Sequence, residues 1–235
     1  MRILAIGGHI GDMELSCGAV LAKHARLGDE VFILATTVGE RGCRHPDKVA
    51  EYKEQKIGEG IRCAQKLGAV ESRHLDYPDT ELPCSREVQI EICEEIRRIR
   101  PDIVITHWNK ATHTDHYNTA INVEKAVWFA KLPTIVTEHP PYGAKKIFYT
   151  DNWEDPVDFV PNVFVSFEEE DMERWQAAIH EFAAARGEVV SFKFEKFYEH
   201  YSYVRGMVAG LPRAQAFYSD LVIKTDKLFS VCNCE

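Results

Sequence analysis

Residues 2–8 read RILAIGG, a short apolar run that stops at two glycines. A continuously apolar segment of this length is typical of a strand buried on both faces, as in a parallel sheet. A similar run, DIVITH at residues 102–107, follows a helical segment and a turn at Pro101. These two segments predict neighbouring central strands of a doubly wound sheet.

Outward from these runs the chain alternates between strand and helix patterns. Further strands are expected at 31–37, 72–76, 145–150 and 162–166. Helices are expected at 12–27, 48–67, 85–100, 116–130, near 168–186 and 189–208, and from about 212. This order predicts one α/β domain over residues 1–235. It has a Rossmann-like, mostly parallel sheet in the order 3-2-1-4-5, with helices on both faces and a helix-rich C-terminal third.

Composition narrows the classes of function. The 235 residues are 45% hydrophobic, enough for a sizeable core, yet no run approaches the roughly 18 apolar residues of a membrane helix. A formal charge of −9 without a basic cluster argues against nucleic acid and membrane surfaces as partners. Seven cysteines without a framework indicate reduced thiols and a cytoplasmic protein, with Cys232 and Cys234 incidental. The oligomeric state stays open, a homo-oligomer included.

Polar clusters follow both central strands. Residues 9–14 read HIGDME after the first strand, and residues 107–116 read HWNKATHTDH after the fourth. Ligands of doubly wound sheets bind outside the carboxyl ends of the strands where the strand order reverses. The two clusters, about a hundred residues apart, are therefore expected to meet in one crevice.

The residue types in these clusters suit a divalent metal. Two imidazoles and one carboxylate, with a position left open for water, are typical of catalytic zinc. His9 and Asp12 lie three residues apart across a helix entry, so both can face one point. Alone, His9 is a polar strand end and Asp12 a helix N-cap. Their occurrence together with the second cluster favours a metal, with His107 ranked below His116 as a ligand.

The two clusters resemble the motifs of the LmbE-like (PIG-L) family of zinc-dependent de-N-acetylases. The family motif His-Pro-Asp-Asp-x-Glu-Leu aligns with HIGDMEL at residues 9–15, and His-x-Asp-His is intact at residues 113–116. Weaker echoes extend the resemblance over about residues 2–217. It implies a metal, expected to be zinc or another divalent ion, held by His9, Asp12 and His116.

The resemblance also implies roles for other residues. His113 matches the histidine that stabilises the oxyanion and protonates the leaving amine, and Asp115 the carboxylate that orients this histidine and raises its pKa. Substrate contacts are implied for four residues of the matching loops and the helix at 48–67, namely Glu40, Arg41, Lys56 and Asp79. The implied substrate is a small N-acetylated compound such as an N-acetylglucosamine derivative.

The sequence departs from the family pattern at the general base. Gly11 stands where the family has the aspartate that accepts a proton, a role typically worth about 10²–10⁴-fold in rate. Ile10 replaces the usual proline, and Gln215 replaces a common glutamate. Another carboxylate could therefore act as the base, the candidates being Glu14, Glu40, Asp79 and the free oxygen of Asp12. Otherwise the substrate or mechanism differs, or the protein binds without efficient turnover.

The leading hypothesis is a zinc-dependent hydrolase that removes an acetyl group from an amino sugar or similar small amide. The alternative is a non-catalytic protein that binds metal and a sugar or metabolite on the same scaffold. Nucleotide binding is disfavoured, because Ile6 occupies the first glycine position of the dinucleotide fingerprint G-x-G-x-x-G.

Overall fold

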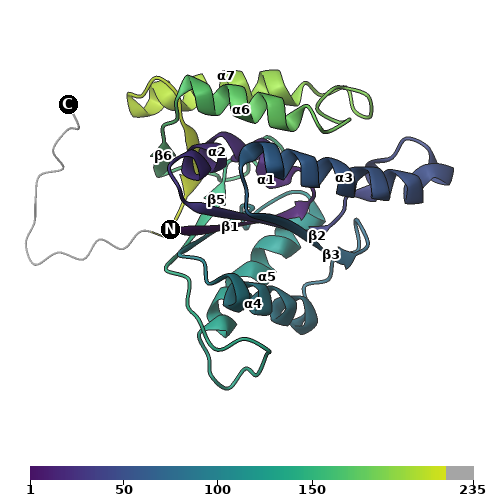
Figure 1. Ribbon diagram of the computed structural model, residues 1–235, viewed down its shortest axis with the longest axis vertical. Helices are drawn as coiled ribbons and strands as arrows, with labels where there is room; N and C mark the ends of the chain where they lie inside the picture. The colour runs from purple at the N-terminus through teal and green to yellow at the C-terminus, as the bar shows by residue number, and fades with distance from the viewer. Residues whose placement is uncertain (221–235) are drawn as a thin grey trace, which may run out of the picture.

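The computed structural model describes residues 1–220, and Cys232 and Cys234 lie outside this part of the chain. One seven-stranded sheet has the order β3-β2-β1-β4-β5-β7-β6 (Figure 1). Its strands are β1 (Arg2–His9), β2 (Glu30–Thr37), β3 (Glu71–Tyr77), β4 (Ile103–Thr106), β5 (Lys146–Thr150), β6 (Val163–Val165) and β7 (Gln215–Tyr218). The first five strands pair in parallel, which confirms the predicted order 3-2-1-4-5.

Helices cover both faces of the sheet (Figure 1). One side carries α1 (Asp12–Ser16), α2 (Gly18–Arg26), α3 (Val49–Leu67), α6 (Glu169–Ile179) and α7 (Phe194–Ala209), with the short 3-10 turns η1 (Glu40–Gly42) and η2 (Pro46–Lys48) before α3. The other side carries α4 (Arg86–Ile99) and α5 (Thr114–Ala130). Along β1, Ile3 and Ala5 enter the first core while Leu4 and Ile6 enter the second. This alternation buries the central strand on both faces.

The predicted helix at 12–27 is interrupted. It ends at Ser16 and restarts at Gly18, because Cys17 has φ −133° and leaves the helical conformation. The Glu14 carbonyl at the end of α1 accepts a hydrogen bond from the Trp175 indole at 2.8 Å. The interruption leaves α1 as a single short turn that carries Asp12 at its start.

The predicted helix from about residue 212 is wrong. That segment forms β7, which lies between β5 and β6 and runs antiparallel to both. Tyr218 pairs with Tyr149, and Phe217 pairs with Val163. Pairing with two neighbouring strands outweighs the helix propensity of the alanine and glutamine in this segment.

The other helix boundaries differ more modestly from expectation. The helix predicted near 168–186 ends at Ile179, and the one predicted at 189–208 begins at Phe194. Residues 180–193 therefore form a long connection on the same side as α1 and α3 (Figure 1). Among residues 1–220, no helix has both the length and the apolar character needed to cross a membrane.

Candidate functional site

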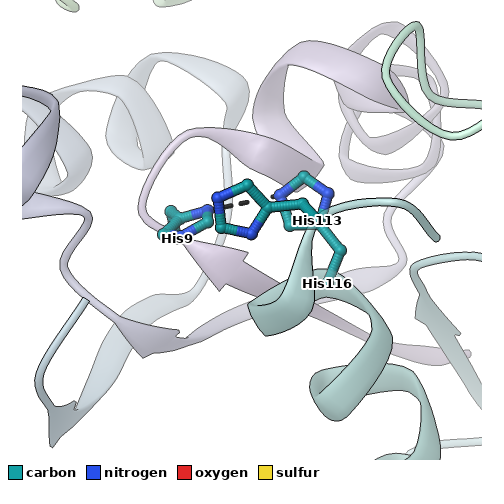
Figure 2. Close-up of side chains that lie close together, drawn as sticks. All are labelled: His9, His113 and His116. Atoms are coloured by element: carbon teal, nitrogen blue, oxygen red, sulfur yellow. Dashed lines mark hydrogen bonds between the residues drawn. The ribbon is translucent and has the colours of Figure 1, made fainter. Parts of the chain in front are cut away.

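The two histidine clusters meet at the carboxyl ends of β1 and β4. His9 is the last residue of β1, Asp12 opens α1, and His116 lies in the first turn of α5. The rings of His9, His113 and His116 turn toward one another from β1 and α5 (Figure 2). Gly8 permits this approach, because a Cβ there would lie 3.0 Å from Cδ2 of His116.

Three donor atoms form a small triangle at this point. Oδ2 of Asp12 lies 3.1 Å from Nδ1 of His9 and 3.3 Å from Nε2 of His116. The two imidazole nitrogens are themselves 3.3 Å apart. Zinc bonds of about 2.0–2.1 Å in a tetrahedron place neighbouring donors about 3.3 Å apart. The spacing and chemistry of these donors fit one face of a tetrahedral zinc site.

A carboxylate holds the far nitrogen of each histidine in the triangle. Nδ1 of His116 donates to Oδ2 of Asp155 at 3.0 Å, and Nε2 of His9 donates to Oδ1 of Asp79 at 3.1 Å. In this tautomer the nitrogen that faces Asp12 keeps its lone pair. Carboxylates commonly orient metal-binding histidines in this way.

The local charges favour a cation. Burial by itself would lower the pKa of His116, but Asp12 and Asp155 raise it to about 9. Burial would raise the pKa of Asp12, yet His9 and His116 hold it well below its ordinary value. Both shifts indicate that the carboxylates here stabilise positive charge on the neighbouring imidazoles.

Asp155 is the residue that the sequence interpretation missed. It is buried, and its carboxylate also accepts hydrogen bonds from the Thr112 N–H at 3.0 Å and the Asn152 amide at 3.2 Å. It follows β5, the neighbour of β4, in the polar stretch DNWED at residues 151–155. A polar stretch directly after this third strand is the sequence signal that could have predicted Asp155.

His107 packs behind the triangle. Its buried ring stacks on His116 with centroids 3.9 Å apart and an interplanar angle of 7°. Nε2 accepts the Gly8 N–H at 2.9 Å and lies 3.0 Å from Oδ2 of Asp12. Burial lowers the pKa of His107 to about 4, so the ring is neutral. Its nitrogen also lies within 4.8 Å of the Asp12 and His116 donors, which keeps it near any ion held there.

His113 stands at the cavity side of the cluster. Its Nδ1 accepts the Asp115 N–H at 3.2 Å, so a neutral ring carries its hydrogen on Nε2. Burial and the neighbouring charges of His116 and His9 lower its pKa. The ring is therefore a neutral hydrogen-bond donor beside the triangle.

The expected contact between the Asp115 carboxylate and His113 is wrong in this structure. That carboxylate instead accepts the backbone N–H groups of Thr80 at 2.6 Å and Leu82 at 3.4 Å. Oδ2 also lies 3.3 Å from Nε2 of His9. Asp115 does raise the pKa of His113 as expected, but burial and the charges of His116 and His9 outweigh it, so the net pKa is lowered. Asp115 ties the loop after β3 to the start of α5.

A cavity of about 370 Å³ opens beside the triangle. Of the four residues predicted to contact substrate, Arg41, Lys56 and Asp79 line it. Glu40 does not line it: this buried side chain accepts the Asp79 N–H at 3.1 Å. Asp79 in turn accepts the Arg41 N–H at 2.8 Å. Glu40 thus supports the cavity wall from behind.

The opposite wall is largely aromatic. Its rings come from α3, the loop after β5, the 180–193 connection and α7. They are, in that order, Tyr52, Trp153, Phe182, and the pair Phe194 and Tyr198. Phe182 faces Gly11, because a Cβ added at Gly11 would lie 3.7 Å from Cζ of this ring. Gly11 also has φ +109°, a conformation that side-chain-bearing residues rarely adopt. An apolar ring therefore faces the position where the family has its aspartate.

The other sequence departures have structural explanations. Ile10 packs against Gly60 of α3, where an added Cβ would come within 2.6 Å of Cγ2 of Ile10. Gln215 of β7 accepts the Val20 N–H at 2.8 Å and so satisfies a free donor in the first turn of α2. Ile10 also lines the cavity, whereas Gln215 does not.

Glu14, one candidate for the missing base, lies below the cavity. It is buried, and its Oε2 accepts the Gly11 N–H at 3.2 Å. Burial raises its pKa to about 7. It does not line the cavity, so it supports the α1 turn from inside.

Comparison with known proteins identifies similar sequences and folds. Residues 4–127 match the family model described as GlcNAc-PI de-N-acetylase (PIG-L). A diacetylchitobiose deacetylase from Thermococcus kodakarensis is 34% identical over 136 residues, which are 56% of this chain and 51% of that protein. The matched region thus spans about half the length of that relative.

Two solved structures share the fold. An N,N'-diacetylchitobiose deacetylase from Pyrococcus horikoshii has a TM-score of 0.78 at 24% identity, covering 93% of this chain and 83% of that chain. GalB, the 4-carboxy-2-hydroxymuconate hydratase from Pseudomonas putida KT2440, has a TM-score of 0.85 at 20% identity, covering 97% and 99%. At these identities the likeness concerns the fold alone.

Proposed function

The chain belongs to the GlcNAc-PI de-N-acetylase (PIG-L) family, and on this basis we propose that it is a metal-dependent hydrolase of N-acetyl groups. Its substrate is a small N-acetylated amino sugar or a similar amide. The observation that carries the proposal is the triangle of Asp12, His9 and His116 donors, with edges of 3.1–3.3 Å. The Thermococcus relative, named as a diacetylchitobiose deacetylase, supports the same class of substrate.

The proposed metal is zinc, held by Nδ1 of His9, the Asp12 carboxylate and Nε2 of His116. When bound, zinc lowers the pKa of water to about 7 and polarises a carbonyl group. The adjoining cavity of about 370 Å³ falls within the usual size range of small-molecule sites. Arg41, Lys56 and Asp79 supply charged groups on its wall for the hydroxyls of a sugar.

His113 is the proposed electrophile. Its Nε2–H can donate to the oxygen that becomes negative when water attacks the amide carbonyl, because Nδ1 is already occupied by the Asp115 N–H. The lowered pKa of His113 is consistent with this role, because it keeps the ring neutral, with its single proton on Nε2 available as a hydrogen-bond donor.

The first experiment combines metal analysis with acetate release. Protein purified without chelator is expected to contain one zinc per chain and to release acetate from at least one N-acetylated amino sugar in a panel. His113→Ala should keep the metal but reduce kcat by about 10²–10³-fold, the effect of removing one oxyanion donor. His200→Ala, which removes an exposed histidine of α7, is the matched control. Loss of metal in His113→Ala would contradict the assigned role.

Hydration of a small unsaturated acid is a second candidate. Gly11 favours it, because the carboxylate expected of a de-N-acetylase is absent from that position. The hydratase GalB shares the fold, and Lys56 and Arg41 could pair with substrate carboxylates. Loss of ultraviolet absorbance from a conjugated dicarboxylic acid, without acetate release from any amide, would support this candidate. Binding of N-acetyl sugars without either reaction would support the non-catalytic alternative.

A further inference from the structure

Four carboxylates line the cavity, and three of them are engaged. Asp12 faces the histidine donors, and Asp79 is held by His9 and the Arg41 N–H. Glu59 accepts hydrogen bonds from the Gln55 amide at 2.7 Å and the Ala183 N–H at 3.3 Å. The fourth, Glu154, is partly buried. Within residues 1–220 its carboxylate has no hydrogen-bond or ion-pair partner, so it is free to act on a bound molecule.

The backbone holds Glu154 in a fixed place. Residues 152–155 form a turn in which the Asp155 N–H donates to the Asn152 carbonyl at 3.1 Å. The Asp155 carboxylate is bonded to His116, and the Asn152 side chain accepts the Tyr198 hydroxyl at 2.9 Å. Both ends of the turn are therefore anchored, one of them to a proposed metal ligand. Glu154 lies between these anchors and shares the cavity lining with His113 and His116.

From this geometry we propose that Glu154 is the general base of the site, in place of the aspartate that Gly11 replaces. The proposal rests on the function proposed above and adds the residue that moves the proton. It also explains why the absence of a carboxylate at residue 11 need not abolish turnover. The structure supplies the group from the end of β5, the strand beside β4.

The surroundings of Glu154 raise its pKa and so make its carboxylate a stronger base. Burial raises the pKa of Glu154, while the positive charges of His116 and His9 oppose the increase and the negative charges of Asp12 and Asp155 add to it. A carboxylate with a raised pKa takes a proton from water more readily than an ordinary surface glutamate. Of these four groups, His9, Asp12 and His116 line the cavity with Glu154, and Asp155 is its neighbour in the chain.

The proposed reaction has two stages, attack of water on the amide carbon and cleavage of the C–N bond. The Glu154 carboxylate takes one proton from water as the water oxygen bonds to the amide carbon and the carbonyl electrons move to oxygen. The C–N bond then breaks as the tetrahedral carbon re-forms its carbonyl. The amine nitrogen receives the proton that Glu154 took from water, while His113 keeps its Nε2 proton and donates it as a hydrogen bond to the oxyanion. The products are acetic acid and the free amine. At neutral pH the acid gives its proton to the amine, which leaves acetate and a protonated amine.

The test compares Glu154→Gln with the wild-type protein on the N-acetyl sugar that the wild type deacetylates fastest. We expect kcat to fall by about 10²–10⁴-fold, as for loss of a positioned base. KM, zinc content and Tm should remain unchanged, because Glu154 bonds to no described residue. The rise of kcat from acidic to neutral pH should disappear in this variant. Glu154→Asp keeps a carboxylate in the cavity and should recover part of kcat.

Asp158→Asn is the matched control. It makes the same carboxylate-to-amide change four residues away, at an exposed side chain that pairs with Lys110 outside the cavity. It should keep wild-type kcat. Full activity of Glu154→Gln alongside an active wild type would overturn the proposal while leaving the proposed function intact. Zinc loss in Glu154→Gln would also overturn it, since the residue would then be structural. A wild type that releases no acetate from any substrate would overturn both.

Discussion

The donor triangle and the wall facing it come from different parts of the chain. The triangle is built from β1, α1 and α5, where the family motifs lie, and the far nitrogen of each of its histidines bonds to a carboxylate. The wall comes largely from residues 152–154 and 182–198, and it places Phe182 opposite Gly11. The N-terminal half thus supplies the three proposed metal ligands. The C-terminal half sets the cavity shape and offers the free carboxylate.

The contrast is not complete, because Asp155 follows the wall residue Glu154 in the same loop yet holds His116. If the wall only shaped the cavity, changes in it would leave the metal untouched. The structure indicates instead that one loop serves both regions. Variants in each region measure how far the triangle and the wall are independent.

Asp155→Asn should have the largest effect. An amide cannot accept from His116 as strongly as the carboxylate does, so the ring loses its fixed tautomer and orientation. We expect zinc affinity to fall by about 10–100-fold, the usual cost of removing such a partner. Competition with a chromophoric chelator measures this change, with Asp158→Asn of the same loop as the control. Unchanged affinity would show that the triangle holds without help from the wall.

The triangle could be predicted from sequence because it depends on local patterns and one topological rule. Each cluster directly follows an apolar strand, and the pairing of β1 with β4 brings strand ends to one edge. The resemblance to the PIG-L family, confirmed by the match over residues 4–127, pointed to the same residues. The wall has no such signature. Phe182 reaches Gly11 only because α6 and its following connection pack over α1, a contact that no local pattern encodes.

Two errors have the same origin. The segment from residue 212 was predicted to be helical, but pairing with β5 and β6 makes it a strand. Asp115 was expected to bond to His113, but the backbone of Thr80 and Leu82 binds its carboxylate instead. In both cases a partner distant in the sequence decides the outcome. Local propensity and motif matching describe what a residue can do, and tertiary packing selects among those options.

Asp171→Asn should weaken the contact between α6 and α2. This buried side chain of α6 receives two hydrogen bonds of 2.8 Å from Arg26 of α2. Burial alone would raise its pKa, but Arg26 and the Glu168 N–H hold it below its ordinary value. We expect Tm at pH 7 to fall by roughly 3–6 °C, as for one hydrogen bond to a charged group in a domain of this size.

The stability that Asp171 contributes depends on pH. A lowered pKa in the folded state adds stability above the ordinary pKa, and this stability is lost as the pH falls through the lowered value. The difference in Tm between the wild type and Asp171→Asn should therefore shrink on acidification below about pH 4. Glu170→Gln is the control, because its exposed ion pair with the same Arg26 should contribute little. A difference in Tm that does not change with pH would mean that packing, and not charge, stabilises the contact between α6 and α2.

Gly11→Asp should have the smallest effect on stability and tests the point where the two regions touch. With φ +109° at this position, any side chain strains the backbone, so Gly11→Ala and Gly11→Asp should both lower Tm by roughly 2–4 °C. Restoring the family's aspartate should not raise kcat, because its Cβ would point at the Phe182 ring. Tm and acetate release, compared between the two variants, separate backbone strain from the carboxylate. A large increase in kcat in Gly11→Asp but not in Gly11→Ala would show that Phe182 moves aside for the new side chain. The aspartate at residue 11 would then act as the base, as it does in the family.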